Sequence, residues 1–217
     1  MPLQKDKRIK KVSSSKKSSE AKYVYHVRIT LRGVRPPIWR KVLVTNDISL
    51  VQFHRIIQLV MGWSGHHLYQ FIIDGNYYSE PFDDDDDDDL DDLVAGPETE
   101  KRASVLLHQV ASEEKARLIY EYDFGDNWEH LIVIQNILPI EEGKHYPVCT
   151  DGKRSCPPED IGGAWGYGQF LEAIRDPNHP QHKRMTDRVG KNYDPEAFDL
   201  DEANRILKEK KNFIING

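Results

Sequence analysis

Two short segments of the sequence concentrate side chains that can do chemistry. Residues 122–130 read YDFGDNWEH, and residues 156–163 read CPPEDIGG. Carboxylates and imidazoles bind divalent cations or transfer protons, and the neighbouring glycines and prolines place such side chains on turns. The two segments are therefore the first places to look for a site.

A divalent-metal centre is the first candidate, with His67, Asp123, Asp126 and His130 as its ligands. The two aspartates flank a turn, His130 lies four residues beyond the second, and one of His66 and His67 can reach it from the end of a predicted helix. The cofactor that this predicts is a divalent metal. In the structural alternative, the aspartates bond the backbone of their own turn and the paired histidines complement the helix dipole.

A second candidate cluster has softer ligands, with the spacing H-x3-C-x6-C at His145, Cys149 and Cys156. Structural zinc sites usually contain closer pairs such as C-x2-C. Glu159 and Asp160, which follow two prolines, are the candidates for catalysis, because either carboxylate can activate a metal-bound water. Alternatively, they begin a helix.

The elements that position these residues follow from the apolar periodicity. Residues 23–31 alternate as a half-buried strand that pairs antiparallel with a second strand at 38–44. Ser49 caps a helix over residues 50–61, which ends at Gly62. Further strands are predicted at 68–74, 77–78, 116–123 and 128–138, and further helices at 169–175 and 200–207. This arrangement places YDFGDNWEH on a hairpin turn, with a polar cleft between the turn and the CPPED segment.

The fold class predicted from this pattern is α+β, a single domain with a mixed, mostly antiparallel β-sheet and helices packed against it. The domain spans residues 23–210 and includes an acidic loop at 83–92. A disordered basic arm precedes it at 1–22, and a tail follows at 211–217. The arm has a formal charge of +6 and the remainder −12, which argues against a general nucleic-acid binder. With two cysteines and no signal or membrane-spanning stretch, we expect a cytoplasmic protein with no membrane contact.

Five ordered blocks over roughly residues 23–207 resemble the plasmid pRiA4b ORF-3-like family. The blocks read RPPIWR, GWSGHHLYQF, YDFGDNWEH, CTDGKRSCPPEDIGG and GYGQFL. The resemblance implies an α+β domain that occurs in bacteria and archaea, on plasmids and near mobile elements, and it assigns no reaction. The family's characteristic positions correspond here to Trp39, Arg40, His67, Asp123, Asp126, Trp128, His130, Cys156, Glu159 and Asp160.

The leading functional hypothesis is a non-enzymatic binding or accessory domain, linked to plasmids or mobile elements, with a protein or nucleic-acid partner. One alternative is a metal-dependent hydrolase or nuclease that uses the His/Asp cluster. Another is a DNA-associated protein that contacts phosphates through the basic arm.

Overall fold

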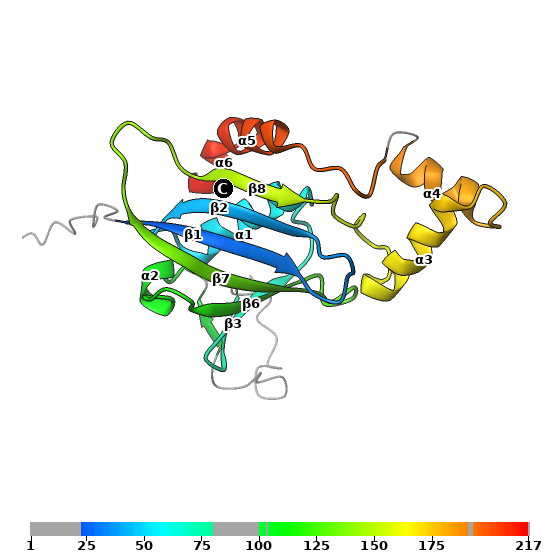
Figure 1. Cartoon of the computed structure of the whole chain (residues 1–217). Helices are drawn as coiled ribbons and strands as arrows, with labels where there is room; N and C mark the ends of the chain where they lie inside the picture. The colour runs from blue at the N-terminus through cyan, green and yellow to red at the C-terminus, as the bar shows by residue number, and fades with distance from the viewer. Residues whose placement is uncertain (1–22, 80–99, 103, 191–192, 217) are drawn as a thin grey trace, which may run out of the picture.

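The computed structural model describes residues 23–79, 100–102, 104–190 and 193–216. The predicted basic arm at 1–22 and the predicted acidic loop at 83–92 lie outside these residues. Figure 1 shows one β-sheet with helices on one of its faces and at its ends.

The sheet has eight strands in the order β5-β4-β3-β6-β7-β1-β2-β8. Neighbours pair antiparallel except for β4 and β5, which are parallel, so the mixed, mostly antiparallel sheet of an α+β fold is confirmed. The strands are β1 (Tyr23–Leu31), β2 (Trp39–Thr45), β3 (Tyr69–Ile73), β4 (Asn76–Ser79), β5 (Glu100–Arg102), β6 (Arg117–Tyr122), β7 (Trp128–Pro139) and β8 (Val148–Lys153).

The helices leave one face of the sheet open. Helix α1 lies behind the sheet in Figure 1, α5 and α6 pack against α1, and α3 and α4 form an extension at one end. The helices are α1 (Leu50–Met61), α2 (Leu107–Val110), α3 (Gly163–Arg175), α4 (His182–Val189), α5 (Leu200–Glu209) and α6 (Lys211–Asn216). No helix of the described residues is long and apolar enough to cross a membrane.

Helix α1 forms where the sequence predicts it because both of its ends are capped. The Ser49 side chain accepts a hydrogen bond from the Gln52 amide, and the Gln52 side chain accepts one from the Ser49 amide. Gly62 ends the helix in the left-handed conformation, with φ 85°. The apolar side of α1 is buried against the sheet and forms much of the core.

Several parts of the chain differ from the prediction, which did not include β5, α2 or α4. The stretch after residue 139, which shows little periodicity, contains β8, and α3 begins at Gly163 instead of residue 169. Three glycines in the first two turns of α3 lower the local helix propensity, which hides this start. The predicted tail at 211–217 includes α6, whose Ile214 is buried against the core.

Candidate functional site

Three side chains from distant segments converge beside the β6–β7 turn. His67 Nε2 lies 3.3 Å from Asp160 Oδ1 and 3.7 Å from Asp123 Oδ2. One potential ligand atom from each residue lies within 4.8 Å of the other two. Asp123 is buried, His67 is half-buried and Asp160 is exposed, so the cluster opens to solvent on the side of Asp160.

The sheet register brings His67 next to Asp123. Strands β3 and β6 pair antiparallel, so the residues before β3 lie beside those after β6, and the Asp123 amide donates to the Leu68 carbonyl at 2.9 Å. Asp123 has φ 57°, a left-handed conformation that aspartate tolerates better than most residues. Its Oδ1 accepts hydrogen bonds from the amides of Gly125 and Asp126, which leaves Oδ2 toward His67.

Asp126 joins the turn to the loop that follows β8. Its carboxylate accepts hydrogen bonds from the amides of Ile161 at 2.9 Å and Gly162 at 3.1 Å. A side chain at Gly163 would overlap the Asp126 carbonyl oxygen, so turn and loop are in direct backbone contact. The sequence predicts a polar cleft between the turn and this segment, whereas the two are in contact at these residues.

His130 lies in the core instead of the cluster. It is fully buried, its Nδ1 is 3.1 Å from the Trp128 carbonyl oxygen, and its ring packs edge-on against Trp63 at 5.3 Å. Burial lowers the pKa of His130 to about 4, which keeps the imidazole neutral. Within the described residues, the four predicted metal ligands therefore do not assemble: His67 and Asp123 meet Asp160, without Asp126 or His130.

Glu159 positions the loop instead of facing an open site. Its two carboxylate oxygens accept hydrogen bonds from the Tyr122 hydroxyl at 2.6 Å and from the Ser64 amide at 3.1 Å. Partial burial acts to raise the pKa of Glu159, but these hydrogen bonds outweigh it and the pKa is lowered. Arg188 of α4 then donates to the main-chain carbonyls of Glu159 and Asp160 at 2.6 and 3.1 Å.

The predicted cysteine cluster is also not assembled within the described part of the chain. Cys149 is buried on β8, Cys156 contacts the Met61 sulfur at 3.7 Å, and His145 is exposed. Burial raises the pKa of Cys156 to about 12, so it remains a protonated thiol and a poor metal ligand at neutral pH.

A mostly apolar cavity of about 490 Å³ lies along the segment 155–159, between the end of α1 and α5. Met61, Trp63, Pro157 and Phe198 contribute to its walls. The CPPED segment thus borders a cavity, but its other walls come from β2, α1, α4, α5 and the loops beside these helices, and not from the hairpin turn.

The position of Asp160 beside His67 was not predicted from the sequence, which gives this residue only as a candidate base. A local signal for it exists. Asp123 and Asp160 each precede a glycine by two residues, and both adopt positive φ, at 57° and 53°. Two aspartates in the same unusual conformation present their carboxylates to one histidine.

The ligand set, one imidazole and two carboxylates, suits zinc or manganese. Three protein ligands also leave coordination positions open to water or to a group from another molecule. The negative charge of the two aspartates favours a cation at this position, and the buried Asp123 is the less screened of the two.

Comparison with known proteins finds a similar sequence, a similar solved structure and a matching family. The chain is 35% identical over 187 residues to "Uncharacterized protein y4hQ" of Sinorhizobium fredii (strain NBRC 101917 / NGR234), a match that covers 86% of this chain and 91% of that protein. The fold is similar to the crystal structure of the protein of unknown function MM3350 from Methanosarcina mazei Go1, with a TM-score of 0.70 and 30% identity. That match covers 83% of this chain and 97% of that one. Residues 23–202 match the family described as plasmid pRiA4b ORF-3-like protein, and the chain belongs to this family.

Proposed function

We propose that the protein is a non-enzymatic binding domain that holds a divalent cation between His67, Asp123 and Asp160 and contacts a protein partner around this ion. The observation that supports this proposal is the convergence of three ligand atoms within 4.8 Å from three separate segments. The hydrogen bonds to Asp123 and the loop contacts of Arg188 hold two of these segments in place before any ion arrives.

The surroundings of the cluster favour a partner over a small substrate. Large apolar side chains are exposed on the same segments: Leu68 beside His67, Phe124 beside Asp123, and Trp165 just after the Gly163 backbone contact. Trp165 is 76% exposed, which is unusual for a tryptophan outside an interface. Exposed aromatic residues of this kind often anchor protein partners.

A metal-dependent hydrolase is the second candidate, and one observation favours it. Three protein ligands with open coordination positions are also the arrangement of catalytic zinc sites. The residue that would have to activate water is poorly suited, however, because both oxygens of Glu159 already accept hydrogen bonds. Binding without turnover is therefore the function that the geometry supports best.

The test is titration of metal-stripped protein with Zn²⁺ and Mn²⁺ by isothermal calorimetry, together with elemental analysis. We expect one ion per chain. Asp160→Asn should weaken binding by roughly tenfold or more, because it removes a charged ligand from an exposed position. His145→Gln, a change at an exposed histidine away from the cluster, is the matched control and should bind as the wild type does.

Two outcomes would contradict the metal proposal: heat changes no larger than dilution for both ions, or an Asp160→Asn variant with wild-type affinity. Hydrolysis of a generic phosphodiester by metal-loaded protein, lost in Asp160→Asn, would instead support the second candidate.

We also propose that this domain acts in the cytoplasm, in the context of plasmids or mobile elements; the description of its family names a plasmid. The DNA-binding alternative depends on the basic arm at 1–22, which lies outside the described residues. Salt-dependent DNA binding that disappears when residues 1–22 are deleted would support that alternative.

A further inference from the structure

The sheet face turned toward the viewer in Figure 1 has no helix over it. Side chains on this open face alternate along each strand with those of the core. On β6, for example, Leu118 and Tyr120 are buried beneath α1, whereas Ile119 is half-buried on the open face between Arg117 and Glu121. The open face is therefore a surface of its own, with its own pattern of residues.

An apolar row crosses the middle of this face. The strand register aligns Ile72 with Ile119, Ile119 with Leu131, Leu131 with Thr30 and Thr30 with Trp39. We call these five residues the central row. All five are only half-buried although no other layer of the described residues packs on them, and aliphatic side chains dominate the row. An aliphatic row of this kind suits another protein surface better than the flat bases of a nucleic acid.

Charged residues flank the central row, with a net negative charge on one side and a net positive charge on the other. The row on one side contains Glu121 opposite Glu129, with Arg32 ion-paired to Glu129 at its end. The row on the other side contains Arg117, Arg28 and Lys41, with Asp151 ion-paired to Lys41 at its end. We call these the acidic row and the basic row. Each lies two residues along the strands from the central row, at a distance of about 7 Å.

We propose that the open face binds a second copy of this chain, around a two-fold axis that runs along the central row. This axis packs the central row of each copy on that of the other, with Ile119 against Ile119. It also places each acidic row over the basic row of the other copy, so Glu121 faces Arg117 of the second copy. A two-fold axis along the strands would instead place equal charges together, which is unfavourable.

Arg28, Arg117 and Glu121 are available for such contacts, whereas Glu129 and Lys41 already form ion pairs with Arg32 and Asp151. Within the described residues, neither Arg28 nor Arg117 has a carboxylate within ion-pair distance, and Arg28 packs over the Trp39 ring at 4.2 Å. Glu121 contacts the amide of Gln70 and not a cation. Arg117 and Glu121 are four residues apart on one extended strand, about 13 Å, so they cannot pair within a single chain.

The size of the face also fits a dimer. The central row spans five adjacent strands, β3 to β2, which is about 20 Å at ~4.8 Å per strand. With the flanking rows and side chains included, the face is of the order of the ~800 Å² per partner found in stable complexes. Two twisted sheets can pack face to face in this way about 10 Å apart.

The experiment is sedimentation equilibrium of the full chain across a concentration series, with single and double charge reversals on β6. Arg117→Glu and Glu121→Arg should each weaken dimerisation by roughly tenfold, since each brings two equal charges together across the axis. The double variant should recover an affinity within a few-fold of the wild type, because the reversed pair is again complementary. Only an intermolecular pairing of these two residues produces this recovery.

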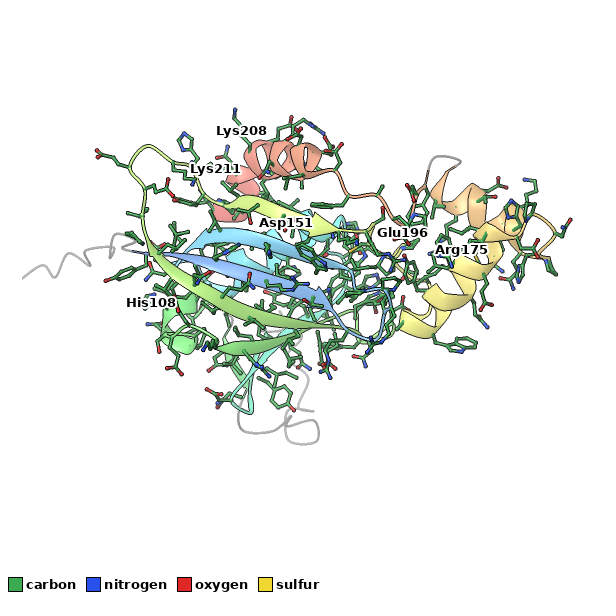
Figure 2. The ribbon with its side chains drawn as sticks, in the orientation of Figure 1. His108, Asp151, Arg175, Glu196, Lys208 and Lys211 are labelled. Atoms are coloured by element: carbon green, nitrogen blue, oxygen red, sulfur yellow. The ribbon has the colours of Figure 1, made fainter. Side chains whose placement is uncertain are left out.

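Two further variants separate dimerisation from folding. Leu131→Glu places a charge in the central row and should give a monomer with an unchanged circular dichroism spectrum. Lys208→Glu is the control: Lys208 lies on α5, away from the open face (Figure 2), and its reversal should leave the mass unchanged.

A wild-type chain that is monomeric at all concentrations would overturn the proposal. A dimer that tolerates Leu131→Glu, or a double reversal no better than the single ones, would also overturn it. If single-stranded DNA bound the wild type and Leu131→Glu abolished that binding, the open face would be a nucleic-acid-binding surface instead of a dimer interface. None of these results depends on metal binding at His67.

Discussion

At the scale of single residues, three histidines of this protein illustrate two different roles of the imidazole side chain. His67 is open to solvent beside two carboxylates, whereas His54 and His130 are buried in the core. His54 stacks on Tyr69 with ring centroids 3.6 Å apart and contacts the Tyr120 hydroxyl at 2.7 Å. The same residue type thus serves as a candidate ligand in one place and as an aromatic core residue in two others.

The two buried histidines predict a sensitivity of stability to acid. Burial lowers the pKa of His54 to about 3 and that of His130 to about 4, against about 6.5 in the unfolded chain. Between the folded and the unfolded pKa of each histidine, the unfolded state binds more protons than the folded state. The free energy of unfolding therefore falls as the pH falls through this range. Each histidine should account for about 2 kcal/mol of loss between pH 6.5 and 4.5.

Urea denaturation at several pH values tests this expectation. His54→Gln should reduce the loss between pH 6.5 and 4.5 by about 2 kcal/mol relative to the wild type, whatever its stability at neutral pH. His145→Gln, at an exposed position, should keep the full loss. An unchanged pH dependence of stability in His54→Gln would refute the prediction that the buried His54 contributes to the acid sensitivity.

At the scale of elements, the start of α3 determines whether the turn and the loop can meet. Gly166 lies so close to the Ile161 carbonyl oxygen that a side chain there would overlap it, whereas no atom lies within 4 Å of a side chain added at Gly168. The two glycines lie two residues apart in the same helix, but Gly166 is closely packed whereas Gly168 has open space around it. Packing requires a glycine at position 166, whereas Gly168 only lowers the helix propensity.

This pair gives a matched prediction. Gly166→Ala should lower the free energy of unfolding by about 2–3 kcal/mol, because backbone must move to admit the methyl group. Gly168→Ala should raise it by about 0.5–1 kcal/mol, as expected for an open position inside a helix. Chemical denaturation of both variants is the measurement, and equal effects of the two substitutions would contradict the packing argument.

The same region explains what could and could not be predicted from the sequence. Helix α1 and strands β1, β2, β6 and β7 have strong apolar periodicity, so their positions were predicted to within one or two residues. Helix α3 was placed six residues late because Gly163 contacts Asp126, which lies 37 residues earlier in the chain, and Gly166 packs against the Ile161 carbonyl. Such contacts between distant segments leave no local pattern.

The candidate site was also predicted only in part, because its residues come from distant segments of the chain. His67 and Asp123 belong to it, but Asp160 replaces His130, because alternation along β7 turns His130 toward the core. The period of a strand fixes which side of the sheet a residue faces. Trp128, His130 and Ile132 share one side of β7 by this rule, so the alternation alone identifies His130 as a core residue.

At the scale of the whole molecule, the domain extends beyond the predicted boundary at residue 210. Helix α6 packs its Ile214 against the core at 3% exposure, while the next residue, Ile215, is 49% exposed. Arg55 of α1 also donates to the Ile214 carbonyl oxygen at 3.3 Å. The end of the described chain is therefore part of the folded unit.

This boundary can be tested with two adjacent isoleucines. Ile214→Ala should cost about 2–4 kcal/mol of unfolding free energy, as for other buried isoleucines. Ile215→Ala should change it by less than about 0.5 kcal/mol. Comparable Tm values for both variants in differential scanning calorimetry would show that α6 is not part of the core.

The strand order has a consequence for how the molecule assembles. Strand β1 pairs with β7, about a hundred residues later, and β3 is joined to β1 only through β6 and β7. Pairings between such distant segments require large loops to close and make folding slow. During synthesis, neither half of the sheet can complete itself until residues 117–139 have emerged. Because Asp123 lies at the turn of this late hairpin, the cluster of His67, Asp123 and Asp160 forms only when the two halves have joined, and binding of the proposed cation would report a finished fold.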